Sequence, residues 1–223
     1  MDTNHPIISL KKAQIYQRNH LILKDVSFEI KNGEFVYLIG KTGSGKSSLL
    51  KTLYGDLRLT EGEGTMVGYN LRKMKEKEIP FLRRKIGIIF QDFQLLEDRT
   101  IEDNLLFVMQ ATDWKDKQKI KKRLHEVLEL VNMTTKSYKM PHQLSGGEQQ
   151  RISIARAFIN NPDLILADEP TGNLDPETSE EIIQLLQDIS SKKTVLMASH
   201  DKYLMDRFPK RTIICEKNNV REK

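Results

Sequence analysis

The sequence predicts an α/β fold in which helices pack on a largely parallel sheet. Three observations lead to this prediction: short apolar runs typical of buried strands, a glycine-rich segment directly after one of them, and stretches of helical periodicity. The apolar run Phe35–Ile39 leads straight into the glycine-rich segment, and a helix is expected from Lys46 to about Tyr54. Other buried strands are expected at 86–90, 164–167 and 194–198, and a further helix at 178–190.

The opening and the middle of the chain differ in their periodicity. Val26, Phe28 and Ile30 alternate with polar residues, which predicts a half-buried strand near the start. Glycines at 62, 64 and 68 interrupt short strands. Residues 92–160 instead carry apolar residues three or four positions apart, as in 101–108 and 120–131. We therefore expect this middle stretch to be an inserted helical subdomain.

The composition is typical of a soluble chain with a sizeable core. Of 223 residues, 38% are hydrophobic, and the mean hydropathy is −0.51. The apolar runs are about five residues long, whereas a membrane span needs roughly 20. The polar start, residues 1–6, lacks the apolar segment of a signal peptide. The single cysteine, Cys215, allows no internal disulfide or cysteine-based zinc cluster, and we expect it to be buried.

The net charge of +5 comes from two short segments. Residues 72–85 carry seven basic and two acidic side chains, and residues 113–123 carry six and two, so the rest of the chain is acidic. Both segments are interpreted as solvated helix faces, with acidic lipid headgroups or a protein partner as the alternative. Nucleic acid is the least favoured partner because no aromatic residues are spaced as stacking platforms.

The glycine-rich segment predicts a phosphate-binding loop. Residues 40–47 match the pattern G-x-x-x-x-G-K-[ST] at every fixed position. Glycines allow backbone N–H groups to point at an anion, and the helix that follows adds its positive end. Lys46 is expected to reach the β- and γ-phosphates of a nucleotide, and Ser47 to ligate Mg²⁺. The predicted nucleotide-binding residues here are Gly40, Lys41, Thr42, Gly43, Ser44, Gly45, Lys46, Ser47 and Ser48.

A second glycine motif selects among nucleotide-binding families. Residues 144–151 read LSGGEQQR and resemble the signature motif of the ABC ATPase family. The serine hydroxyl and the glycine amides of Ser145, Gly146 and Gly147 begin a helix expected at 148–159, which again suits an anion. The apolar run that ends at Asp168 and Glu169 resembles the Walker B strand of the same family.

The resemblance implies a P-loop NTPase fold with a RecA-like core sheet, an antiparallel β subdomain and an inserted α-helical subdomain. The whole chain is expected to form one ABC ATPase domain. Within it, about 1–91 and 161–223 would form the catalytic core with the β subdomain, and about 92–160 the helical subdomain with the signature motif.

The resemblance also assigns roles to residues that follow the family's order. Asp168 would hold Mg²⁺ and Glu169 would polarise the attacking water. Gln91 would contact Mg²⁺ or water, and His200 would hydrogen-bond the γ-phosphate. Tyr16 stands where the family places an aromatic ring that stacks on adenine, with a plain packed tyrosine as the alternative.

The same resemblance implies that the active unit is an ATP-dependent homodimer. Residues 145–147 of one copy would complete the site of the other copy, which would supply Lys46, Ser47, Gln91, Asp168, Glu169 and His200. ATP would then hold two copies together until hydrolysis removes the γ-phosphate contact.

Within the family, residues 78–92 and 94–104 are most similar to the FtsE family of cell-division ATPases. That similarity implies a peripheral protein on the cytoplasmic face of the inner membrane. It would couple ATP to a membrane protein of FtsX type and so regulate peptidoglycan hydrolases. LolD-like and MacB-like ATPases for lipoprotein release or efflux share residues 167–175 and are the main alternative.

Two alternatives from other classes are disfavoured. A soluble, non-transport ABC protein acting on nucleic acid or ribosomes would typically carry two cassettes, zinc motifs or long coiled-coil insertions, and this chain shows none of these. A P-loop kinase acting on a small molecule would leave the motif at 144–151 without a purpose.

An apolar cluster follows Gln91 in a segment interpreted as a loop. We hypothesise that Phe93, Leu95 and Leu96 form part of an exposed groove for a helix of the membrane partner. The alternative is a local core under the loop.

Overall fold

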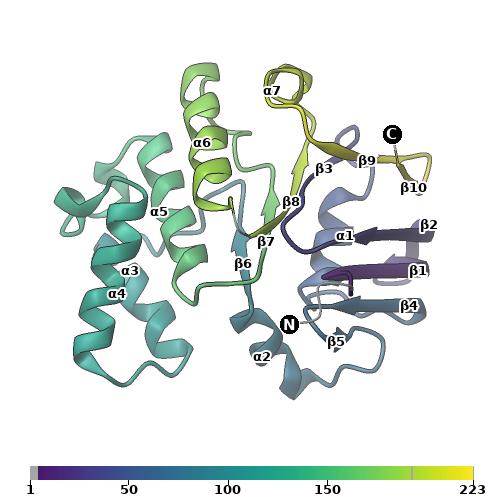
Figure 1. Ribbon diagram of the computed structural model, residues 1–223, viewed down its shortest axis with the longest axis horizontal. Helices are drawn as coiled ribbons and strands as arrows, with labels where there is room; N and C mark the ends of the chain where they lie inside the picture. Colours follow the sequence, from purple (N-terminus) through teal and green to yellow (C-terminus); the bar gives the residue numbers. More distant parts are fainter. Residues whose placement is uncertain (1–4, 192, 223) are drawn as a thin grey trace.

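Two β-sheets and a group of helices make up the computed structural model, which describes residues 5–191 and 193–222. In Figure 1 the antiparallel sheet lies on the right, the parallel strands cross the centre, and helices α3, α4 and α5 lie on the left. The polar start predicted to lack a signal peptide falls largely outside the described residues, since residues 1–4 are not among them.

The elements follow one another as a β-rich opening, a helical middle and a strand–helix alternation. The strands are β1 (Ile8–Gln17), β2 (His20–Ile30), β3 (Phe35–Ile39), β4 (Glu61–Met66), β5 (Tyr69–Asn70), β6 (Ile86–Ile89), β7 (Leu164–Asp168), β8 (Thr194–Ser199), β9 (Arg211–Glu216) and β10 (Asn219–Glu222). The α-helices are α1 (Lys46–Leu53), α2 (Ile79–Arg84), α3 (Ile101–Ala111), α4 (Lys117–Leu130), α5 (Gly146–Phe158), α6 (Pro176–Ile189) and α7 (Lys202–Arg207). Short 3₁₀ helices cover Glu76–Glu78, Thr134–Lys136 and Pro141–Gln143.

The larger sheet has the strand order β10-β9-β3-β8-β7-β6 and is parallel except for β10. Its register pairs Ile39 with Ser199 and Asp168 with Ala198, so β3, β7 and β8 end at the same edge. The smaller sheet, β2-β1-β4-β5, is antiparallel throughout. The predicted fold class, with a core sheet, an antiparallel β sheet and a helical part, is confirmed.

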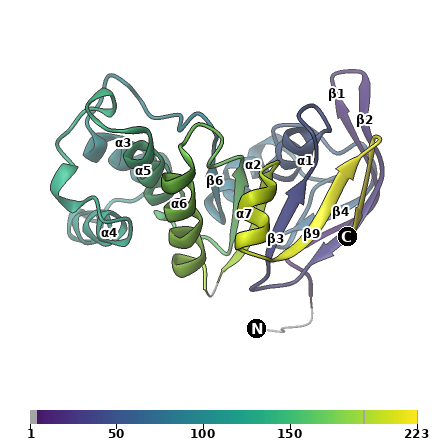
Figure 2. The same ribbon diagram turned by 90° about the horizontal axis from the view of Figure 1, so that it is seen from above.

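One hydrophobic core lies between the two sheets. Val36 and Leu38 of β3 point into it, and α1 fills it with Leu49, Leu50 and Leu53, all of which are buried. Figure 2 shows α1 beside the parallel strands, with β1, β2 and β4 beyond it. The helix that follows the phosphate loop is therefore packed against both sheets.

A second core lies on the opposite face of the parallel sheet. Tyr37, between Val36 and Leu38 in sequence, points to this face, as the two-residue repeat of a strand requires. Helices α3, α4, α5 and α6 pack here. The apolar residues that recur every three or four positions in the middle segment point into this core. Because strand and helix residues share one cluster, the boundary proposed at 92–160 stays a prediction.

The prediction of an exposed groove after Gln91 is wrong, because the second core includes part of this segment. Leu95 is only 8% exposed and belongs to the second core, against which Phe93 also packs. The alternative, a local core under the loop, is therefore the one that fits Leu95 and Phe93. Their burial is favourable because it removes apolar area from water. Leu95 is therefore not part of an exposed binding groove.

The basic segments mostly expose their charges, as a solvated surface would. Arg83 is held by a bond to the Tyr54 carbonyl at 3.1 Å, and Arg123 of α4 donates to the Phe158 carbonyl at 2.6 Å, so these two guanidinium groups serve local structure. In the described part of the chain, no helix combines the length and apolar character needed to cross a bilayer.

Candidate nucleotide site

The phosphate loop runs from the end of β3 to the start of α1 and depends on three glycines. Gly43 and Gly45 have φ values of +79° and +104°, which L side chains rarely adopt. At Gly40 an added Cβ would lie 2.3 Å from the carbonyl oxygen of Cys215. The loop therefore needs glycine at all three positions, two for the backbone conformation and one for the close approach of β9.

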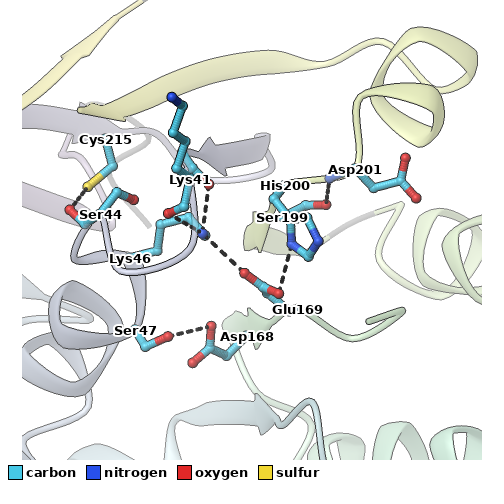
Figure 3. Close-up of polar contacts among 11 residues, drawn as sticks. Lys41, Ser44, Lys46, Ser47, Asp168, Glu169, Ser199, His200, Asp201 and Cys215 are labelled. Atoms are coloured by element: carbon cyan, nitrogen blue, oxygen red, sulfur yellow. Dashed lines mark hydrogen bonds and ion pairs between the residues drawn. The ribbon is translucent and has the colours of Figure 1, made fainter. Parts of the chain in front are cut away.

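Lys46, the first residue of α1, turns its side chain back into the loop. The side chain is only 4% exposed, and its Nζ donates to the carbonyl oxygens of Gly40 at 2.8 Å and Lys41 at 3.3 Å. The same Nζ lies 3.1 Å from Oε1 of Glu169 (Figure 3). A buried ammonium group surrounded by acceptors is thus placed inside the loop that is predicted to bind phosphate.

Glu169 lies at the end of β7 in an uncommon backbone conformation. Its φ is +48°, and its N–H donates to the Ala198 carbonyl at 3.0 Å, which fixes the residue against β8. Its carboxylate is 14% exposed and bridges two groups, because Oε2 lies 2.9 Å from Nδ1 of His200 while Oε1 faces Lys46. His200 itself is 53% exposed, so its ring borders solvent.

Asp168 and Ser47 form a second pair next to the first. The Ser47 hydroxyl donates to Oδ1 of Asp168 at 3.1 Å (Figure 3). Burial raises the pKa of Asp168, and the bond from Ser47 partly offsets that effect. A carboxylate and a hydroxyl side by side are oxygen donors of the kind that Mg²⁺ accepts together with phosphate oxygens.

Gln91 shares a cavity with this pair. The cavity, of about 670 Å³, is lined by Ser47, Asp168 and Gln91 among others. An added Cβ on Gly172 would lie 2.9 Å from the Gln91 amide nitrogen, and Asn173 donates to the Gln91 carbonyl at 2.9 Å. The loop after β7 therefore holds Gln91 from the side.

A further cavity, of about 710 Å³, opens beside the phosphate loop. Lys41, Thr42, Ser44 and His200 line it, so loop residues and the histidine face one space. Among the described residues the buried Ser44 hydroxyl has no hydrogen-bond partner, which suits a site that receives a polar ligand. Ser48 lies in the first turn of α1, where its carbonyl accepts from the Thr52 hydroxyl at 3.0 Å.

The residues of the signature motif begin helix α5. Ser145 is the N-cap, since its Oγ accepts from the Glu148 N–H at 3.3 Å and its own N–H donates to Glu148 at 3.0 Å. An added Cβ on Gly147 would lie 2.5 Å from Thr178, so α6 packs closely here. Within the described ranges, Ser145, Gly146 and Gly147 line neither of the cavities around Lys41 and Gln91.

Tyr16 lies on the β1–β2 hairpin, whose far strand touches the phosphate loop. Ile22 and Leu23 of β2 lie against Gly45, and Tyr16 pairs with Leu21 across the hairpin. The Tyr16 hydroxyl donates to Glu61 at 2.9 Å, which raises its pKa. The hairpin is close enough to the loop to suit stacking on a base, and that role stays a prediction.

Two contacts at the site could not be predicted from the sequence. Cys215 is buried as predicted, but its thiol donates to the Ser44 carbonyl at 2.9 Å and so supports the phosphate loop from behind. The Lys46–Glu169 contact joins residues more than a hundred positions apart. Only the sheet register, which brings β3 and β7 to one edge, places these groups together.

Comparison with known proteins assigns the family. The family model described as ABC transporter matches residues 23–172, a stretch that contains the phosphate loop, the signature motif and Asp168–Glu169. The chain belongs to the ABC transporter family.

Similar curated proteins include several cell-division proteins. This chain is 45% identical over 212 residues to the cell division ATP-binding protein FtsE of Bacillus subtilis. The aligned stretch covers 94% of this chain and 92% of that relative. The chain is 42% identical over 198 residues to FtsE of Escherichia coli, with 87% and 88% covered. The predicted resemblance to the FtsE family is confirmed.

Solved structures of ABC cassettes share the fold. The dimeric post-hydrolysis state of the cassette MJ0796 bound to ADP and Pi matches with a TM-score of 0.84, 36% identity and 97% of each chain covered. The structure of cbiO1 from Clostridium perfringens matches with a TM-score of 0.87 and 27% identity, covering 97% of this chain and 87% of that one. Together with the family match, these findings confirm the prediction of an ATP-binding ABC-type ATP hydrolase.

Proposed function

We propose that this chain is an FtsE-like ATPase subunit in bacterial cell division. Two copies would close on two ATP molecules, and that movement would pass to a membrane partner of FtsX type that regulates peptidoglycan hydrolases. The similarity to several FtsE proteins over most of the chain supports the division role. The subunit would lie peripherally on the cytoplasmic face of the inner membrane, and no nucleic-acid partner is expected.

The observation that carries the catalytic proposal is the chain of contacts Lys46–Glu169–His200. Without nucleotide, the ammonium group of Lys46 pairs with Glu169 and donates to carbonyls of its own loop. A γ-phosphate in the loop offers Lys46 stronger acceptors and therefore frees one oxygen of Glu169. Glu169 can then accept a hydrogen bond from the attacking water, while His200 contacts the γ-phosphate from the solvent side.

Ser47, Asp168 and Gln91 fit a magnesium site. All three residues line one cavity next to the phosphate loop, and the Ser47–Asp168 bond orients both groups before a cation arrives. These residues would hold Mg²⁺, which would help to neutralise the negative charge that develops on the phosphates during hydrolysis. Lys41 through Ser48 would contact the phosphates, and Tyr16 the adenine ring.

The homodimer proposal rests on the placement of the signature motif. Ser145, Gly146 and Gly147 present a hydroxyl and backbone amides at the start of α5, away from the cavities of their own chain. An anion-binding helix end that does not face its own phosphate loop is suited to the nucleotide of a second copy. One chain would therefore carry two complementary half-sites.

The substitution Glu169→Gln tests this proposal. It keeps the size of the side chain and removes the charge, so ATP binding should persist while hydrolysis falls at least about a hundredfold. Because hydrolysis would no longer open the pair, ATP should convert the variant from monomer to dimer in sedimentation velocity. Normal turnover by Glu169→Gln would contradict the assignment of Glu169, and a variant that stays monomeric with ATP would contradict the dimer.

The partner is tested separately. Co-expression with the FtsX-type membrane protein of the same organism should give a detergent-stable complex, whereas a lipoprotein-release permease should not co-purify. The reverse result would move the chain to the LolD-like group without changing its ATPase assignment.

A further inference from the structure

An ion pair lies directly behind the signature serine. Lys136, the last residue of a 3₁₀ helix, contacts Oε1 of Glu148 with its ammonium group. The other oxygen of Glu148 accepts the N–H of Ser145 at 3.0 Å. Both carboxylate oxygens are therefore engaged, one by a cation and one by the N-cap residue of α5.

Glu148 creates an electrostatic conflict at this helix end. In the first turn of α5, an acidic side chain is favourable in the isolated chain, because it opposes the positive helix end and completes the capping box. In the proposed dimer, the same end must accept the triphosphate of the second copy. A carboxylate beside that position repels the phosphates, because like charges at close range are unfavourable.

Glu148 does not resolve the conflict by taking up a proton. The hydrogen bond from Lys136 is the main cause that lowers the pKa of Glu148, and the Ser145 N–H and Lys139 act in the same direction. The carboxylate is therefore ionised at neutral pH. Its charge has to be compensated by a neighbouring cation.

We propose that Lys136 is a positioning residue of the signature end, which neutralises Glu148 so that Ser145, Gly146 and Gly147 can bind the ATP of a second copy. This inference rests on the proposed homodimer. Lys136 acts through Glu148 and not by contact with nucleotide.

The Lys136–Glu148 pair is partly shielded from solvent. The side chains of Lys136 and Glu148 are 36% and 24% exposed, so solvent screens their interaction only in part. Lys139 contributes charge without a hydrogen bond to Glu148, which makes it a matched control on the same segment.

The experiment measures the ATP-driven dimer in the full-length Glu169→Gln chain, where the closed state accumulates. Four versions are compared by sedimentation with ATP: the parent, Lys136→Met, Glu148→Gln with Lys136→Met, and Lys139→Met. Lys136→Met should raise the dimer Kd at least about fivefold at low salt, because Glu148 keeps an uncompensated charge. The double variant should return to within about twofold of the parent, since glutamine still accepts the Ser145 N–H without carrying charge.

Ionic strength separates charge compensation from a structural role. The deficit of Lys136→Met should shrink as salt is raised from about 0.05 to about 0.5 M, because screening weakens the repulsion. Lys139→Met should stay within about twofold of the parent.

Two results would overturn the inference alone. They are a Lys136→Met chain that dimerises like the parent, and a double variant that stays as weak as Lys136→Met, which would make the contact purely structural. A parent chain that ATP does not dimerise would instead overturn the proposed dimer, and this inference with it.

Discussion

The ammonium group of Lys46 lies 3.1 Å from a carboxylate oxygen of Glu169, and both side chains are largely buried. The residue expected to bind phosphate and the residue expected to orient water thus neutralise each other at the edge where β3, β8 and β7 end. Because His200 contacts the other oxygen of Glu169, a change at Lys46 reaches the histidine through a single carboxylate.

Lys46→Ala should affect both binding and stability. Nucleotide affinity should fall at least about tenfold, because the phosphates lose their buried cation. The free energy of unfolding without nucleotide should fall by about 1–3 kcal/mol, because Glu169 keeps its charge without its partner. Titration with a fluorescent ATP analogue and urea unfolding measure the two effects. Lys24→Ala, on the exposed side of β2, is the control and should change neither.

Asp168→Asn should stabilise the nucleotide-free chain at neutral pH. Burial raises the pKa of Asp168, so the folded chain holds this proton more tightly than the unfolded chain. The ionised group therefore opposes folding above its folded pKa, and this cost disappears as the pH falls toward its ordinary value of 3.8.

For a chain of this size the gain should raise the Tm by about 1–4 °C at pH 7.5. The gain should shrink progressively at lower pH in a thermal-shift series. The exposed Asp206→Asn serves as the control and should show no such trend. A lower Tm for Asp168→Asn at pH 7.5 would contradict the sign of this argument.

Arg156→Met should destabilise the loop that follows Gln91. The Arg156 guanidinium donates to the carbonyls of Phe93, at 2.7 Å, and Gln94, and both of these residues have positive φ values. Burial lowers the pKa of Arg156 to about 10, which still leaves it charged at neutral pH. Its loss leaves two carbonyls without a donor and should cost about 2–4 kcal/mol in urea unfolding.

Two other substitutions on α5 calibrate that measurement. Arg156→Lys retains the charge and one bond, so its loss should be smaller. Arg151→Met removes a bond to Glu181, whose side chain is 59% exposed, and should cost under about 1 kcal/mol. If Arg156→Met costs no more than Arg151→Met, the guanidinium does not hold the loop.

The sequence predicts β3, β6, β7 and β8 of the parallel sheet well because these strands are largely buried, but it does not predict β9. The expected strand at 35–39 is β3 itself, and that at 164–167 lacks only Asp168 of β7. The last third of the chain was less predictable. Helix α6 starts two residues before the expected 178, because Asp175 caps it by accepting the Thr178 N–H at 3.0 Å. Strand order was not predicted, since the apolar runs resemble one another.

The candidate site is likewise predicted in its local motifs but not in its tertiary contacts. The phosphate-loop motif indicates Lys46 and Ser47, and the family resemblance implies Asp168 and Glu169 as their partners. It does not indicate the left-handed backbone of Glu169, which depends on its bond to β8. The prediction of an exposed groove at Leu95 is wrong for a related reason: a short apolar run can be an exposed binding surface or a buried patch, and only tertiary packing decides.

Helix α5 connects the signature motif to the segment that follows Gln91. Ser145 caps its first turn, and Arg156, near its last, holds the backbone after Gln91. Thirteen residues of α-helix span about 20 Å and resist compression along their axis. In the proposed dimer, a displacement of the capped end would therefore move the whole helix and, with it, the backbone after Gln91. The signature motif and the predicted magnesium site of one chain would then be mechanically coupled.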